Sequence, residues 1–132
     1  MSRKPETVFS TSVHKHLPKG LYRVKNNNPF AGGIPDFWFS GNKGDLWIEY
    51  KYVKALSKNG TAVTLSELQT KWLRDRYMEG RNVAVIVGCK DGGFILRDLE
   101  WDNAIPPSAY TTNLLPRQVI AQWIQSVTVT LK

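Results

Sequence analysis

Two acidic residues and a lysine in the first half of the chain have the types and the spacing of a site for phosphate chemistry. Asp36 ends a Gly-Ile-Pro-Asp stretch, and Glu49 and Lys51 belong to one Glu-Tyr-Lys triplet. Hard divalent cations prefer carboxylate oxygens, and a lysine beside such an ion can act on a phosphate or on its attacking water. Pro-Asp is also a common turn, and Glu-x-Lys is common on solvated strands, so the meaning of the pattern depends on the elements that carry it.

The segments around these residues predict a β-hairpin that brings them together. Residues 33–39 and 45–52 are rich in aromatic and branched residues, which favour strands, and a Gly-Asn-Lys-Gly turn separates them. A symmetrical hairpin pairs Phe39 with Leu46, Trp38 with Trp47, Phe37 with Ile48 and Asp36 with Glu49. Opposed Cβ atoms lie about 5 Å apart, and Lys51 shares the face of Glu49 because side chains alternate along a strand. Facing carboxylates repel each other, so the hairpin predicts a cation between them.

A helix predicted at residues 61–80 follows the hairpin and carries an inward-facing amide. Thr64 and Glu67 have capping-box spacing at its start, and Gly80 is a stop signal at its end. Gln69 lies on the face that helical spacing predicts to be buried, together with Leu65, Leu68, Trp72 and Leu73. A buried amide without partners costs about 1–3 kcal/mol. Gln69 is therefore either a satisfied boundary residue or part of the polar cluster on the hairpin.

The remaining elements follow from apolar runs and helix breakers. Residues 82–88 are typical of a buried strand, and the strand–helix–strand order predicts that this strand is parallel to residues 45–52. The other predicted elements are a helix at 6–17, a first strand at 21–24, an edge strand at 94–96, a polar loop at 98–113 and a helix at 117–127. On the last helix, an apolar stripe belongs either to the core or to a dimer seam. The stripe consists of Val119, Ile120, Trp123, Ile124 and Val127.

These motifs and their order resemble the PD-(D/E)XK nuclease superfamily, and within it the VRR-NUC-type and phage junction-resolvase-like branch. The resemblance covers roughly residues 6–88, through Glu6, Gly33, Pro35-Asp36, Glu49-Tyr50-Lys51 and Gln69. It implies an α/β fold with a restriction-endonuclease-like core, namely a helix, a three-stranded antiparallel meander, a crossover helix and a parallel strand, here with a C-terminal helix. We expect one nuclease domain over residues 1–132, with a core at about 6–97 and a C-terminal loop and helix at about 98–132.

The resemblance also implies a role for each matching residue. Asp36 and Glu49 would bind Mg²⁺, the carbonyl of Tyr50 would add a ligand, and Mn²⁺ would substitute for Mg²⁺. Lys51 would orient the attacking water or stabilise developing charge, and Gln69 and Glu6 would support the site. The expected activity is hydrolysis of DNA to a 5′-phosphate and a 3′-hydroxyl. The chain departs from a minimal pattern in its longer and more basic linker at residues 54–63.

Composition favours a polyanionic partner. The formal net charge is +7, from 18 Lys and Arg against 11 Asp and Glu, and the basic residues form several short clusters that suit contacts to a nucleic-acid backbone. One metal site cuts one strand, so we expect a homodimer that prefers branched DNA, as in Holliday-junction resolution. The alternatives are a general or nicking DNA nuclease of the same fold and a non-catalytic nucleic-acid-binding module. With no apparent signal peptide or membrane span, we expect an intracellular, cytoplasmic protein that is phage-encoded and acts in the host cell.

Four further residues are assigned ordinary roles. His14 and His16 lack the partners of a zinc site and are expected at a solvated helix end, where a phosphate contact is the alternative. Asp45 is expected to be a turn residue rather than a metal ligand. Cys89 is the single cysteine, so there is no disulfide framework.

Overall fold

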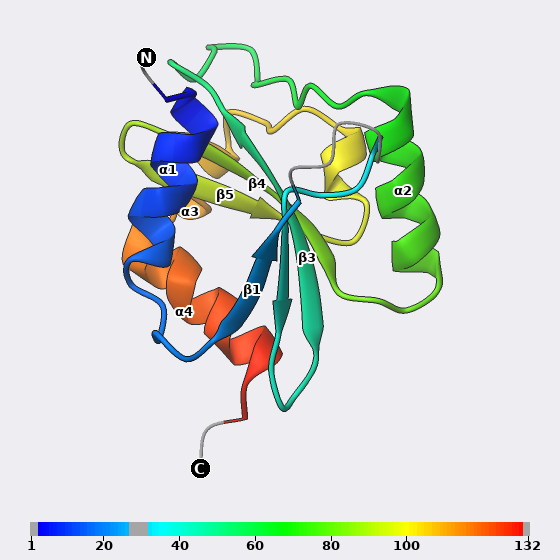
Figure 1. Ribbon diagram of the computed structural model, residues 1–132. Coiled ribbons are helices and arrows are strands. Elements are labelled where there is room, and N and C mark those ends of the chain that lie inside the picture. Colours follow the sequence, from blue (N-terminus) through cyan, green and yellow to red (C-terminus); the bar gives the residue numbers. More distant parts are fainter. Residues whose placement is uncertain (1–2, 27–31, 131–132) are drawn as a thin grey trace.

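A five-stranded mixed sheet with helices on both faces organises the protein (Figure 1). The structure is a computed structural model and describes residues 3–26 and 32–130. The strands lie in the order β1 (Tyr22–Lys25), β2 (Phe37–Ser40), β3 (Asp45–Tyr52), β4 (Val83–Cys89) and β5 (Gly92–Leu96). The helices are α1 (Pro5–His14), α2 (Glu67–Met78), α3 (Ala109–Thr112) and α4 (Arg117–Thr128), and a 3₁₀ turn spans Glu100–Asp102.

The pairing of the strands confirms the predicted hairpin and crossover. In the antiparallel pair of β2 and β3, Phe37 pairs with Ile48, Trp38 with Trp47 and Phe39 with Leu46. β3 and β4 are parallel and are connected through α2, and β5 is antiparallel to β4 at the edge of the sheet. The register keeps Glu49 and Lys51 on one face of β3, while Ile48 and Tyr50 point to the other face.

Each face of the sheet has its own hydrophobic core. The helices α1 and α4 cover one face, where Phe9, Val13, Phe39, Ile48 and Tyr50 are buried, and α2 lies on the opposite face (Figure 1). There Leu73 packs with β4 and β5 and with the segment that follows the sheet, through Trp101, Ile105 and Ala109. The predicted loop at residues 98–113 is therefore part of the core and contains two short helical turns.

The start of α2 differs from the predicted helix because another residue caps it. Ser66, rather than Thr64, is the N-cap: the Gln69 N–H donates to its Oγ over 3.1 Å, and the Ser66 N–H donates to Gln69 Oε1 over 3.0 Å. The helix begins at Glu67, so Leu65 precedes it and Leu68 lies in its first turn with 60% of its surface exposed. The prediction that Leu68 is buried is therefore wrong: its backbone packs against Gly33, while its side chain is largely exposed.

The apolar stripe of α4 belongs mainly to the core. Ile120 and Ile124 are fully buried, whereas Val119 is 37% exposed. Trp123 and Val127 are partly buried against the same cluster. The interpretation as core is confirmed for Ile120 and Ile124, which pack in the same cluster as β3 and α1 within one copy, and the dimer seam stays a prediction.

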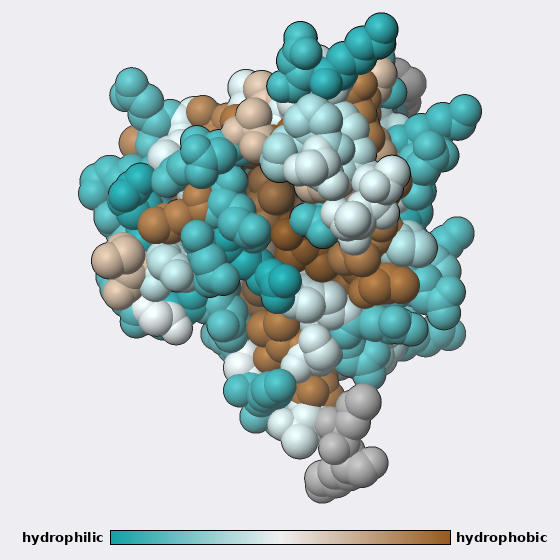
Figure 2. Space-filling view, turned by 180° about the vertical axis from the view of Figure 1, so that it is seen from behind, coloured by the Kyte–Doolittle hydropathy of each residue, from teal (hydrophilic) through white to brown (hydrophobic). Residues whose placement is uncertain are grey.

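Hydrophobic surface is also exposed on the side opposite to the view of Figure 1. Figure 2 shows hydrophobic residues gathered near the middle of this side, with hydrophilic residues around them. A hollow of about 260 Å³ lies between β5 and residues 103–113 and is lined mainly by apolar side chains. Across residues 3–26 and 32–130, no helix is long and apolar enough to span a membrane.

Candidate active site

The predicted site residues meet where β2 begins and β3 approaches its end. Asp36 immediately precedes β2, while Glu49, Tyr50 and Lys51 follow one another in β3. The backbone N–H of Tyr50 donates to Asp36 Oδ2 over 3.2 Å, so the carboxylate of Asp36 is held against β3. The first turn of α2, the helix that follows β3, brings Gln69 to the same place.

Gln69 joins the two functional side chains of β3. Its Nε2 donates to Glu49 Oε2 over 3.2 Å, and its Oε1 accepts from Lys51 Nζ over 3.3 Å. Lys51 Nζ also lies 3.6 Å from Glu49 Oε2. Because Gln69 Oε1 accepts from Ser66 as well, the capping box of α2 fixes the orientation of this amide. Gln69 therefore fulfils both predicted alternatives, because the same side chain is satisfied at the helix cap and belongs to the polar cluster.

Burial gives the two carboxylates unusual protonation behaviour. Glu49 is only 4% exposed, and its burial, together with the negative charge of Asp36, raises its pKa to about 8. Burial also raises the pKa of Asp36, although the Tyr50 N–H and the Lys51 charge oppose that change. In the metal-free protein, the pair therefore shares a proton at neutral pH.

The chemistry of this pair fits a hard divalent cation. Glu49 Oε1 is buried and receives no hydrogen bond from a donor of the protein, so once the proton shared with Asp36 leaves, its charge is costly unless a cation binds there. No group of three His, Cys, Asp or Glu side chains could hold a metal within the part of the chain that the structure describes. Two carboxylates and a carbonyl leave positions for water, which suits Mg²⁺ because this ion keeps several waters. The assignment of Asp36, Glu49 and Tyr50 as ligands stays a prediction.

The glycine before Asp36 allows the loop to approach α2 closely. Gly33 has a φ of +88°, a left-handed conformation that other residues adopt rarely. A Cβ at Gly33 would lie 2.5 Å from the carbonyl oxygen of Leu68 and 2.7 Å from its carbonyl carbon. Since Leu68 precedes Gln69, this backbone contact sets the distance between the Asp36 loop and the turn that carries Gln69.

Substitution of Gly33 should therefore destabilise the protein and disturb the site. We expect Gly33→Ala to lower the free energy of unfolding by more than about 1 kcal/mol, through backbone strain and through the clash with Leu68. Gly80→Ala separates these causes, because Gly80 has a φ of +85° but open space around it. Gly20→Ala should be neutral, since nothing lies within 4 Å of its added Cβ. Urea unfolding checks the order, and equal losses for Gly33→Ala and Gly80→Ala would refute the close approach.

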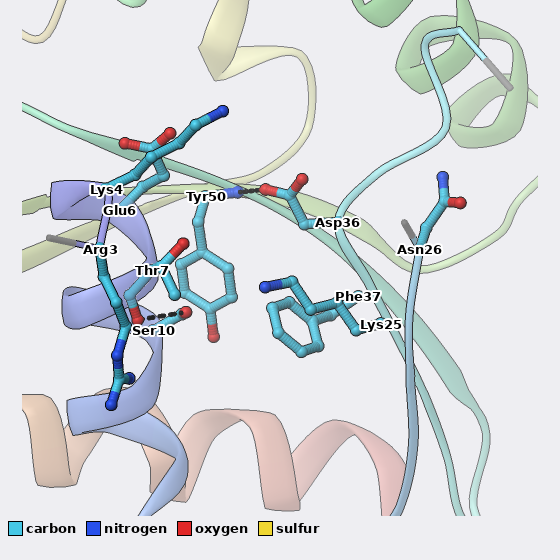
Figure 3. Close-up of a pocket in the computed structure, with 10 residues that line it drawn as sticks. All are labelled: Arg3, Lys4, Glu6, Thr7, Ser10, Lys25, Asn26, Asp36, Phe37 and Tyr50. Carbon is cyan, nitrogen blue, oxygen red and sulfur yellow. Dashed lines mark hydrogen bonds between the residues drawn. The ribbon is translucent and has the colours of Figure 1, made fainter. Parts of the chain in front are cut away.

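A hollow beside Asp36 connects the site to the start of α1. It has a volume of about 460 Å³ and is lined by Glu6, Asp36 and Tyr50 together with the basic side chains Arg3, Lys4 and Lys25 (Figure 3). Glu6 faces this hollow from the first turn of α1, and its charge contributes to the raised pKa of Asp36. Among the described residues, no hydrogen bond links the carboxylates of Glu6 and Asp36, so the part that Glu6 plays in the site stays a prediction.

A hydrogen bond behind the site was not predicted from the sequence. His14 Nε2 lies 2.7 Å from the Tyr50 hydroxyl, and the imidazole also packs edge-on against Phe37 and Phe39. Burial, together with the charges of Arg23 and Lys25, lowers the pKa of His14 to about 3, so the ring is neutral. The expected solvated helix end is wrong for His14 and agrees with the exposed His16. His14 follows the buried Val13 and lies four residues after the buried Ser10, a signal that helical spacing offered.

The remaining ordinary assignment agrees with the structure. Asp45 begins β3 at the hairpin turn, where its carboxylate accepts from Trp38 Nε1 over 3.0 Å and from Ser40 Oγ over 2.9 Å. These two hydrogen bonds hold the Asp45 carboxylate at the hairpin turn, away from the cluster of Asp36 and Glu49.

The raised pKa of Glu49 predicts how stability depends on pH in the metal-free protein. The folded state holds a proton that the unfolded state releases near pH 4.5, so stability falls as pH rises toward about 8. His14 acts only below about pH 6.5, where its lowered pKa makes stability fall as pH falls. Between about pH 6.5 and 8.5 we expect a loss of about 1–2 kcal/mol that Glu49→Gln abolishes. Chemical denaturation in EDTA at both pH values checks this, and an unchanged wild-type stability would contradict the shared proton.

Comparisons with known proteins identify the fold. No family model matches the chain, and no curated protein matches it. Among solved structures, the chain is similar to Hjc, a Holliday junction resolvase from the archaeal hyperthermophile Archaeoglobus fulgidus. The TM-score is 0.56 with 17% sequence identity, and the match covers 89% of this chain and 97% of that chain. This likeness confirms the predicted restriction-endonuclease-like α/β fold with its C-terminal helix.

Proposed function

We propose that this protein is a metal-dependent deoxyribonuclease that hydrolyses phosphodiester bonds. The observation that carries this proposal is the buried Glu49 carboxylate, which has one oxygen held by Gln69 and Lys51 and the other without a partner. Asp36 lies beside it through the Tyr50 N–H. A fold shared with a Holliday junction resolvase supports the same conclusion. A solvated strand face does not bury an acid with an unsatisfied oxygen. The alternative that Glu-x-Lys is an ordinary solvated pair on a strand therefore explains this geometry poorly.

Each side chain of the cluster has a distinct chemical role in this proposal. Asp36, Glu49 and the Tyr50 carbonyl would hold Mg²⁺, which would supply charge to neutralise the phosphate and to acidify a water. Lys51 remains partly accessible, with 28% of its side chain exposed, so its ammonium can face the attacking water or the phosphate. Gln69 positions that ammonium through Oε1 and leaves Glu49 Oε1 free toward the cation. The resemblance to the superfamily implies 5′-phosphate and 3′-hydroxyl products.

The charge around the site suits the backbone of DNA. Arg3, Lys4 and Lys25 line the hollow that contains Asp36, and Lys25 makes no ion pair among the described residues. The exposed Lys54 and Lys58 lie on the linker that follows β3. Side chains distributed in this way contact phosphates rather than base edges, so we infer structure-dependent rather than sequence-dependent recognition.

The finer parts of the proposal concern substrate and assembly. We propose that the substrate is branched DNA and that a homodimer cuts it, because the described residues form one such cluster and resolution of a junction needs two cuts. Mn²⁺ should replace Mg²⁺, and Glu6 should support Asp36 from α1. The VRR-NUC-type and phage junction-resolvase branch, the phage origin and the cytoplasmic location remain predictions from the sequence.

A cleavage assay separates the proposal from its alternatives. The purified protein is incubated with four-way-junction, nicked and linear DNA in Mg²⁺, in Mn²⁺ and in excess EDTA. We expect paired nicks at symmetrical positions in the junction and no cleavage in EDTA. Equal cleavage of junction and linear duplex would indicate a general nuclease, and binding without cleavage in either metal would indicate a nucleic-acid-binding module.

A further inference from the structure

The hydrogen bond between His14 and Tyr50 lies in the apolar core directly behind the proposed metal site. His14 is the last residue of α1, and Tyr50 is the middle residue of the Glu-Tyr-Lys triplet in β3. The distance between His14 Nε2 and the Tyr50 hydroxyl is 2.7 Å, and Tyr50 is only 2% exposed. The proposed chemistry uses the backbone of Tyr50 and gives no role to this pair of side chains.

Aromatic rings hold both partners of the bond in place. The imidazole of His14 packs edge-on against Phe37 and Phe39, with ring centroids 4.6 Å and 5.2 Å away. The ring of Tyr50 packs edge-on against Phe37 at 5.7 Å and against Phe9 at 6.2 Å. Turning either partner away from the other would break these ring contacts, so the pair has one favoured arrangement.

A polar pair in this place is better suited to fix a position than to add stability. Two apolar side chains of the same shape can stabilise a core as well as a buried hydrogen-bonded pair does. Unlike apolar side chains, a buried polar pair is satisfied only in the arrangement that makes its hydrogen bond, so it specifies one packing of the elements that carry it. Here these elements are α1 and β3.

The point of β3 that the pair fixes is the point where the strand meets the site. Figure 3 shows both ends of Tyr50: its backbone N–H is bonded to Asp36, and its ring points away from that carboxylate. Glu49 and Lys51 flank Tyr50 and point to the opposite face of the strand. A shift or rotation of β3 at Tyr50 would therefore change the distance to Asp36 and the direction of Glu49 together.

We propose that His14 is a positioning residue of the metal site and that it acts through Tyr50. It fixes β3 where the Tyr50 N–H meets Asp36 and where the Tyr50 carbonyl would face the cation. The same bond fixes α1 against β3, and α1 carries Glu6, which faces the hollow beside Asp36. His14 itself lies behind the strand and contacts neither the cation nor the DNA. The inference rests on the proposed function in one respect, which is the presence of the cation.

Replacing both partners with phenylalanine tests this inference, because it removes the hydrogen bond and leaves no partner unsatisfied. We expect the double variant His14→Phe with Tyr50→Phe to be folded and at least as stable as wild type in urea with EDTA. In the same metal-free protein, hydrogen exchange of the Tyr50 amide should become at least about tenfold faster relative to that of Val85, which is fully buried in β4. The Kd for Mn²⁺, measured by calorimetry, should rise at least about tenfold.

Tyr110→Phe is the matched control. It also removes a tyrosine hydroxyl with a hydrogen bond of 2.7 Å, here to Thr61 and to the Ser57 carbonyl, but away from the site. This variant should lower the stability and leave both the relative exchange of the Tyr50 amide and the Kd for Mn²⁺ unchanged. If the double variant fails to fold, Tyr50→Phe alone, which removes a single oxygen atom, replaces it with the same expectations for exchange and for Mn²⁺.

Two outcomes would overturn the inference. The first is a folded variant in which the relative exchange of the Tyr50 amide or the Kd for Mn²⁺ stays at the wild-type value. The second is a Tyr110→Phe variant that changes both quantities as much, since the effect would then come from general loosening of the protein. Wild-type protein that binds Mn²⁺ but cuts no DNA refutes the proposed nuclease alone. If wild type binds no Mn²⁺, the proposed metal site fails, and the exchange of the Tyr50 amide in EDTA still decides whether His14 positions the strand.

Discussion

Replacing Glu49 with glutamine is expected to reduce the rate of DNA cleavage in Mg²⁺ by at least about 1,000-fold, since a metal ligand supplies several kcal/mol of charge stabilisation. Asp36→Asn should have the same effect. Neither variant should unfold, because each keeps the size of the side chain and removes repulsion between two buried acids. In EDTA at pH 8, the free energy of unfolding should stay level or rise. Single-turnover cleavage and urea unfolding measure the two effects.

A matched aspartate on the same hairpin provides the control. Asp45 bonds to Trp38 and Ser40 and lies outside the cluster, so Asp45→Asn should cleave DNA at a rate close to that of wild type. If Glu49→Gln or Asp36→Asn keeps the wild-type turnover, the assignment of the metal ligands is wrong. If Asp45→Asn loses as much cleavage activity as those two variants, the effect comes from disturbance of the hairpin and not from loss of a metal ligand.

Removal of the lysine should separate chemistry from binding. Lys51→Ala is expected to lower the cleavage rate by about 100-fold or more, because the ammonium held by Gln69 acts on the water or on the phosphate. The affinity for DNA should change little, since one phosphate contact is a small part of the salt-dependent binding energy. Rates come from single-turnover assays, and affinities come from titrations of labelled DNA at several salt concentrations.

Two exposed lysines on the following linker make the opposite prediction. Lys54→Ala and Lys58→Ala should weaken binding and lower the salt slope by about one each if they contact phosphate, with little change in the rate at saturating protein. An equal loss of affinity and of rate in all three variants would mean that Lys51 is another backbone contact.

The hairpin was predictable because two local rules agree on it. A turn rich in glycine ends both strands, and the alternation of aromatic residues leaves one register that buries Phe37, Phe39 and Ile48 together. That register alone places Asp36 beside Glu49 and Lys51. The continuous apolar run of β4 and the helix before it then determine the crossover.

The start of α2 was harder to predict because several residues compete for the N-cap. Thr64 and Ser66 both have suitable side chains, and Glu67 and Gln69 both have suitable partners three residues later. The contact between Leu68 and Gly33 favours the later cap, and this contact depends on the folded loop. The structure places Gln69 in the polar cluster, one of the two alternatives that its spacing left open, and the sequence does not reveal that its capping bonds orient it.

The features that the sequence did not predict depend on tertiary contacts. The bond between His14 and Tyr50 joins residues on α1 and β3, and no local pattern specifies such a pair. The stripe of α4 has the same spacing whether it faces the core or a partner, and the packing of Ile120 and Ile124 decides for the core.

Anomalous diffraction from crystals grown with MnCl₂ tests most directly the claim that this cluster is a metal centre. We predict a manganese peak between the carboxylates of Asp36 and Glu49 and next to the Tyr50 carbonyl, and we predict its loss in Glu49→Gln. A peak that appears only elsewhere, or no peak in active crystals soaked at high MnCl₂, would contradict the account.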